Sequence, residues 1–107
     1  MSENKQQPLH KAGRSYVKKL IRMRRHLIKE GVNNYQHAHE VVERLDKLLN
    51  FWPYDTPRKM AYFVHNHSAE ILYLIPGPNC RAHNSLTAEF NSLLSQSQQL
   101  LHHESIC

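Results

Sequence analysis

Apolar residues recur at intervals of three and four along this chain, and this spacing limits the fold more than any other sequence feature. It is clearest between Tyr35 and Trp52 and between Leu86 and Leu101. Such intervals place side chains on one face of an α-helix, whereas strand residues alternate between two faces. A chain of 107 residues has room for one domain. We therefore expect an all-α fold, a small irregular helical domain of about four helices at residues 14–107, after a flexible, mobile N-terminal tail at residues 1–13.

Capping residues, glycines and prolines predict where these helices begin and end. The predicted boundaries are Ser15 and Gly31 for the first helix, Asn33 or Asn34 and Pro53 for the second, Asp55-Thr56-Pro57 for the start of the third, and Ser85 for the start of the last. Residues 58–75 are ambiguous, because the apolar run at 71–75 suits either a helix or a buried strand. One helix, two helices broken near residues 65–68, or a partial strand all fit this segment. We favour helix, since no second strand is evident to pair with it.

The apolar stripe of the last helix needs a partner within the single core. We expect it to pack against the stripe on the C-terminal half of the second helix. The residues predicted to meet are Leu86, Phe90, Leu93, Leu94, Leu100 and Leu101 on one side and Leu45, Leu48, Leu49 and Trp52 on the other.

Positive charge is concentrated in one stretch of the chain. The formal net charge is +5, and residues 11–29 hold eight of the 14 Lys and Arg residues without one acid. Neighbouring cations weaken a helix, so this stretch suits binding of phosphates or of an acidic protein patch better than a merely solvated face. The residues predicted to bind a partner or phosphates are Lys18, Lys19, Arg22, Arg24, Arg25 and Lys29. Of these, Arg22, Arg24 and Arg25 are expected to lie largely off the apolar stripe. They would give affinity without sequence specificity, because no groove-reading motif accompanies them.

The chain also has nine histidines, which raises the question of a metal site. The best candidate set is His65, His67, Cys80 and His83, four ligands of the types that zinc prefers. Against it, a spacing of two residues turns His65 and His67 to different sides of a helix. We therefore expect no metal and no cofactor, and we keep a small zinc-stabilised regulatory module as an alternative.

No catalytic constellation stands out in the sequence. It contains no nucleophile elbow, no glycine-rich phosphate loop and no close carboxylate pair in an apolar setting. Cys80 and His83 lie close in the sequence, but no third group is placed to orient them. We expect a protein that is not an enzyme and that acts by binding.

The segment Ile75-Pro76-Gly77-Pro78-Asn79 cannot continue a helix. It is expected to form an exposed loop, and an ordinary turn between two helices is the simplest interpretation. An exposed Gly77-Pro78 bond is also a suitable ligand for a prolyl isomerase, because a Gly-Pro bond isomerises with little preference for trans.

The polar N-terminus, Met1–Pro8, does not look like a secretory signal. No window approaches the roughly 18 uncharged apolar residues of a membrane span. We therefore expect a cytoplasmic protein without membrane contact.

A short, basic, helical chain with Gly77-Pro78 in a loop and no catalytic motif resembles the lambdoid phage anti-RecBCD modulator proteins. The resemblance implies a bacteriophage protein of the host cytoplasm that binds the host RecBCD helicase-nuclease, acts as a RecBCD inhibitor or modulator, and favours phage DNA recombination. It further implies a host prolyl isomerase as a partner at Gly77 and Pro78. The alternative is a non-specific nucleic-acid-binding protein that uses the basic first helix directly.

Overall fold

The computed structural model describes residues 8–32, 35–52 and 55–106, the last four by their backbone only. Five helices form within these ranges: α1 (Leu9–Lys29), α2 (Tyr35–Phe51), α3 (Pro57–Asn66), α4 (Ser68–Leu74) and α5 (His83–Ile106). No strand occurs among the described residues, so the expected all-α fold is confirmed. The helices number five because the third expected helix is divided into α3 and α4.

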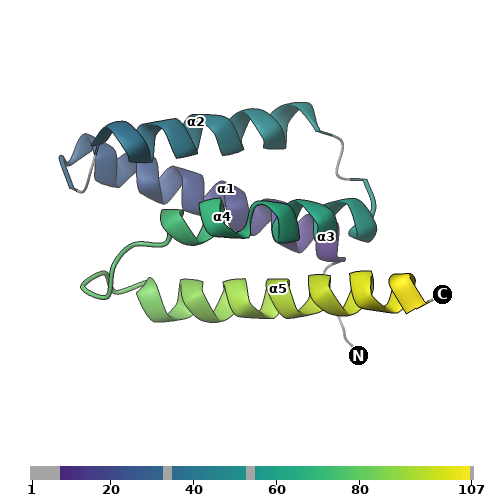
Figure 1. Ribbon diagram of the computed structural model, residues 1–107. Helices are drawn as coiled ribbons and strands as arrows, with labels where there is room; N and C mark the ends of the chain where they lie inside the picture. The colour runs from purple at the N-terminus through teal and green to yellow at the C-terminus, as the bar shows by residue number, and fades with distance from the viewer. Residues whose placement is uncertain (1–7, 33–34, 53–54, 107) are drawn as a thin grey trace.

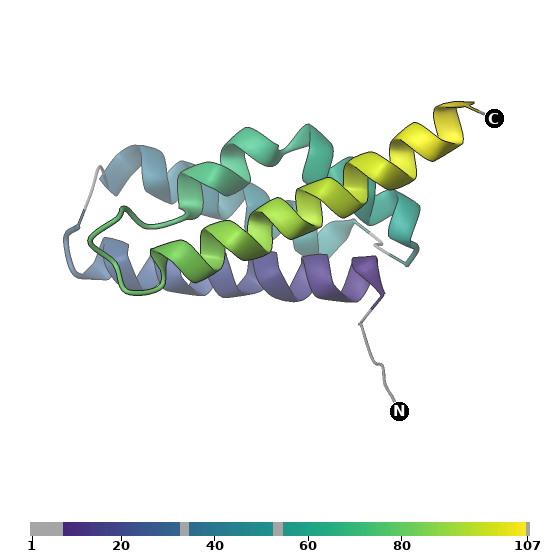
Figure 2. The same ribbon diagram turned by 90° about the horizontal axis from the view of Figure 1, so that it is seen from below.

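Successive helices run in alternating directions, except that α4 continues in the direction of α3 (Figure 1). α1 and α2 form an antiparallel hairpin, α3 and α4 follow one another, and α5 returns beside them. Figures 1 and 2 together place α1 behind α3 and α4, with α2 on one flank and α5 on the other. The outer side of α1 therefore faces away from the other helices.

The start of α1 differs from the expectation. The helix begins at Leu9, six residues before the predicted cap Ser15, so residues 9–13 belong to the helix and not to a tail. The reason is Gly13, which is buried and packs against α3. A Cβ atom at this position would lie 2.7 Å from the side-chain Cγ of Met60. Glycine here permits close helix packing and does not end the helix. Residues 1–7 of the expected tail lie outside the described residues.

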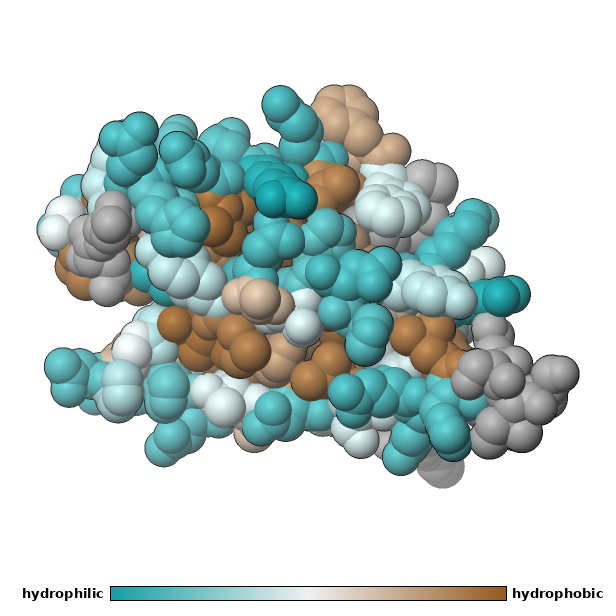
Figure 3. Space-filling model, viewed as in Figure 1, coloured by the Kyte–Doolittle hydropathy of each residue, from teal (hydrophilic) through white to brown (hydrophobic). Residues whose placement is uncertain are grey.

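The apolar stripe of α5 is covered by helices other than the one predicted. Leu86, Phe90 and Leu93 are buried, as predicted. The rest of their stripe, which is half-buried, consists of Leu94, Leu100 and Leu101. α5 packs chiefly on α3 and α1, whereas the prediction paired it with α2. Figure 3 shows apolar side chains along the line between α5 and the helices above it, surrounded by hydrophilic ones.

The ambiguous segment 58–75 is helical, with a break at His67 near the predicted place. The predicted start of α3 is confirmed, because the Thr56 side chain accepts a hydrogen bond from the Lys59 N–H at 3.2 Å, with proline at the first helical position. Gly31 follows α1 with a φ of 76°, as expected of a helix stop. The predicted caps Asn33 and Asn34 and the predicted stop Pro53 lie outside the described residues. None of the described helices combines the length and the apolar character that a membrane span requires.

Candidate functional site

The outer face of α1 carries a row of cations. Lys11, Lys18, Arg22 and Lys29 are exposed, and their spacing of 7, 4 and 7 residues places them one above another on the side opposite the core. At 1.5 Å per residue the row extends for roughly 27 Å. We call these four residues the α1 row. The sequence-based set contained three of them and omitted Lys11, which had been assigned to the tail.

Two ion pairs flank the α1 row. On the α5 side, the Lys19 Nζ lies 3.2 Å from a carboxylate oxygen of Glu89. On the α2 side, the Arg25 guanidinium lies 2.6 Å from Asp46 and 3.3 Å from Glu43. The hydrogen bond that Arg25 donates to the Asp46 carboxylate, supported by the nearby Glu43, raises the pKa of Arg25. These acids are thus bonded to flanking cations, and α1 itself contains none. Among the described residues, no acid is paired with a member of the α1 row, so its positive charge is uncompensated there.

Arg24 is not part of this exposed surface, although the sequence-based set included it. Its side chain is turned into the fold and the residue is only 5% exposed. The guanidinium donates to the backbone carbonyl of Tyr73 and, at 3.4 Å, to that of Ile75, and it lies 5.3 Å from the centre of the Tyr73 ring. Burial lowers the pKa of this group. Arg24 therefore connects α1 to the C-terminal end of α4, where the backbone carbonyls have no hydrogen-bond donor within the helix.

The residues proposed as zinc ligands are not assembled into a site. His67 at the junction of α3 and α4 lies 2.7 Å from a Glu70 oxygen, through Nδ1, while His65 is exposed. His83 instead uses its Nδ1, which lies 2.7 Å from the carbonyl oxygen of Pro76. Across the described ranges, no three His, Cys, Asp or Glu residues, including Cys80, are grouped to hold a metal ion. The contacts of His67 and His83 lie at the two connections on either side of α4.

The Gly77-Pro78 segment is an exposed turn at the end of the bundle, between α4 and α5 (Figure 1). Pro76 is buried and anchors the turn, and the Cys80 N–H donates to the Gly77 carbonyl at 2.9 Å. Gly77 has no atom within 4 Å of the place where a Cβ would stand. Both Gly77 and Pro78 are therefore accessible to a partner.

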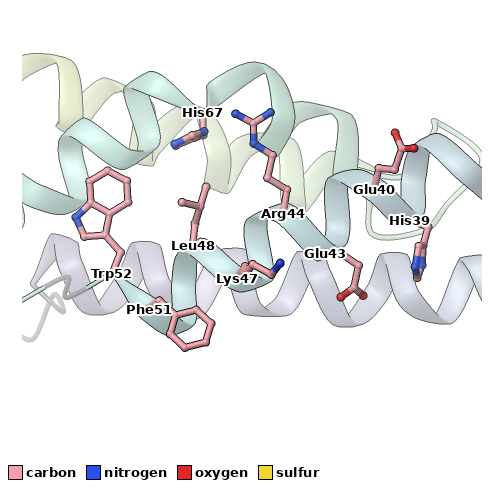
Figure 4. Close-up of a pocket in the computed structure, with 9 residues that line it drawn as sticks. All are labelled: His39, Glu40, Glu43, Arg44, Lys47, Leu48, Phe51, Trp52 and His67. Atoms are coloured by element: carbon pink, nitrogen blue, oxygen red, sulfur yellow. The ribbon is translucent and has the colours of Figure 1, made fainter.

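The outer side of α2 holds a second surface, which the sequence analysis missed. A hollow of about 890 Å³ lies along this helix and reaches His67 (Figure 4). Leu48 and His67 point toward one another there, with Trp52 beside them, while Phe51 projects on the other side of α2. Phe51 is 82% exposed and Trp52 37%, although Trp52 also packs edge-on against the Phe63 ring at 6.3 Å. The signal available in the sequence was an aromatic pair, Phe51 and Trp52, that follows four charged residues.

Comparison with known proteins adds no relative to this description. No protein-family model matches the chain, and no curated protein or solved structure resembles it significantly. Function is therefore argued from the surfaces alone.

Proposed function

We propose that this protein binds nucleic acid with little sequence preference and that the α1 row contacts the phosphates. The observation that supports the proposal is the uncompensated row of Lys11, Lys18, Arg22 and Lys29, whose flanking acids are already paired with Lys19 and Arg25. Four aligned cations attract a polyanion and release its counterions on binding. Lys and Arg side chains bound to phosphates position a protein on nucleic acid without reading its bases.

The composition of this face favours phosphates over a protein partner. A protein–protein interface has an apolar centre depleted of charge, with charge at the rim. The α1 row has Ser15 and His26 beside it and no exposed apolar side chain along it. It also lacks the aromatic residues on which single-stranded bases stack. Double-stranded nucleic acid, gripped by its backbone, is the partner that fits these residues best.

The test compares two triple variants that remove the same charge. Lys18→Gln/Arg22→Gln/Lys29→Gln removes three of the four cations of the α1 row, whereas Arg58→Gln/Lys59→Gln/Arg81→Gln removes three exposed cations elsewhere. Fluorescence anisotropy with a short labelled duplex at low salt measures the affinity of each. We expect the first variant to bind at least tenfold more weakly and the second to stay within about twofold of the parent. Equal losses in both variants, or no binding by the parent protein, would refute the proposal.

The exposed Gly77-Pro78 turn favours a second candidate function. In that case the protein would be an accessory factor that docks on a DNA-processing complex such as RecBCD and also binds a prolyl isomerase of the host. Pro78→Ala removes the ring but no buried side chain, so the free energy of unfolding should change by less than about 1 kcal/mol. Calorimetric titration with a purified cyclophilin-type isomerase should show binding to the parent protein and none to Pro78→Ala. The same protein should also co-purify with RecBCD, and failure of both assays would exclude this function.

A further inference from the structure

The outer face of α2 has a charge pattern that is complementary to itself. Glu40 and Lys47 are two turns apart at the centre of the exposed side, and both are exposed. Gln36 continues the same line toward the N-terminus of α2, and Phe51 continues it toward the C-terminus. The negative charge thus lies in the first half of the face and the positive charge in the second. Reversing the direction of the helix exchanges the two.

We propose that two copies of this chain associate through α2, with the two helices antiparallel across a two-fold axis that passes between positions 43 and 44. In this register Glu40 of each copy lies opposite Lys47 of the other, so the ion pair forms twice. Phe51 of each copy lies opposite Gln36 in the first turn of the other α2. The contact then buries a large aromatic side chain that is 82% exposed in the isolated chain.

The residues beside this central line do not oppose the pairing. Near a two-fold axis, Glu43 approaches Glu43 of the second copy, and Arg44 approaches Arg44. Glu43 is already bonded to Arg25 at 3.3 Å, and the Arg44 Nε lies 3.2 Å from a Glu70 oxygen. Each like-charged pair is therefore compensated within its own chain.

A second copy fits this face better than a polyanion or an unrelated protein does. Glu40 and Glu43 would repel phosphates, and the face has no net excess of either charge. A single helix pair is a small interface, below the usual size of a permanent dimer, so the association should depend on protein concentration and on salt.

The dimer has one consequence that rests on the proposed function. The two-fold axis of an antiparallel helix pair lies in the contact plane and perpendicular to both helices. This direction runs from front to back in Figure 1 and vertically in Figure 2, and the outer side of α1 faces along it. Both α1 rows would then face the same side of the dimer, and a duplex long enough to reach both would be bound with avidity.

Sedimentation velocity without nucleic acid tests the dimer separately from the function. The parent protein should pass from the 12.6 kDa monomer to twice that mass as concentration rises toward the millimolar range. E40K and K47E each place like charges together twice and should weaken self-association by roughly tenfold or more. An equimolar mixture of E40K and K47E should form a heterodimer, and the double variant E40K/K47E should dimerise again.

A second pair of variants tests the aromatic contact. Phe51→Ser should weaken the dimer, whereas Tyr62→Ser, at a 44% exposed tyrosine on α3, should not. A parent protein that stays monomeric throughout the concentration series would overturn the proposal. So would single charge reversals that behave like the parent, or a mixture that fails to restore the dimer.

Discussion

The outer faces of α1 and α2 belong to one helical hairpin, yet they differ in how their charges are balanced. The α1 row consists of four cations, and the acids that flank it on α5 and α2 are bonded to Lys19 and Arg25. The face of α2 has acids in its first half and bases in its second half, and it ends in an exposed Phe51. We infer from this comparison that compensation within the fold matters more for the choice of partner than the number of exposed charges. The first face is proposed to bind a polyanion and the second to bind its own copy.

The largest expected effect is a difference in the free energy of unfolding between variants at a buried and at an exposed arginine of α1. Arg24→Ala should lower the free energy of unfolding by about 2–4 kcal/mol, because the carbonyls of Tyr73 and Ile75 lose their buried donor. Arg22→Ala, two residues away on the exposed row, should change it by no more than about 0.5 kcal/mol. Urea denaturation measures both values. Similar values for the two variants would mean that Arg24 does not join α1 to α4.

A smaller effect on the free energy of unfolding is expected at the contact between α1 and α5. The Tyr16 hydroxyl donates to the Leu86 carbonyl at 2.7 Å, and Tyr16→Phe should cost about 1 kcal/mol of unfolding free energy. Burial, aided by the negative charge of Glu89, raises the pKa of Tyr16 above its ordinary value. The neutral form is therefore favoured in the folded state. Its contribution to stability is complete below the ordinary tyrosine pKa of about 10 and is lost as the pH rises beyond it.

The measurement is the free energy of unfolding of both proteins between neutral pH and pH 11. The parent protein should lose more stability than Tyr16→Phe above about pH 10. Parallel curves would show that this hydroxyl titrates as freely in the folded chain as in the unfolded one.

The sequence was sufficient to predict that the helices exist, but it was not sufficient to predict which helices pack against one another. Periodic apolar positions and the Thr56-Pro57 start predicted where most helices lie. α5 packs on α3 and α1, which approach each other closely where Gly13 meets Met60, and these contacts join residues far apart in the chain. Spacing within one segment contains no information about such a contact.

The candidate site was predicted in part. Lys18, Arg22 and Lys29 are on the exposed face, as expected, whereas Arg24 is not. Arg24 lies four residues after Leu20 and four before Ile28, so a helical projection places it on the apolar side. Arg24 was nevertheless expected to be exposed because it is charged. A buried arginine needs acceptors such as backbone carbonyls, and the carbonyls that accept from Arg24 lie at the C-terminal end of α4, a segment distant in the sequence. The α2 face was missed because its acids and bases are equal in number, so the face shows no net charge in the sequence.

The most direct test of the central claim is the salt dependence of duplex binding. Contacts with four phosphates predict a plot of log affinity against log salt concentration with a slope of roughly −3.5 for the parent protein. Lys18→Gln/Arg22→Gln/Lys29→Gln should reduce the slope to roughly −1, because one cation of the α1 row is left. The variant Arg58→Gln/Lys59→Gln/Arg81→Gln should keep the parent slope. A parent slope near zero, or equal slopes for both variants, would contradict the assignment of α1 as a phosphate-binding surface.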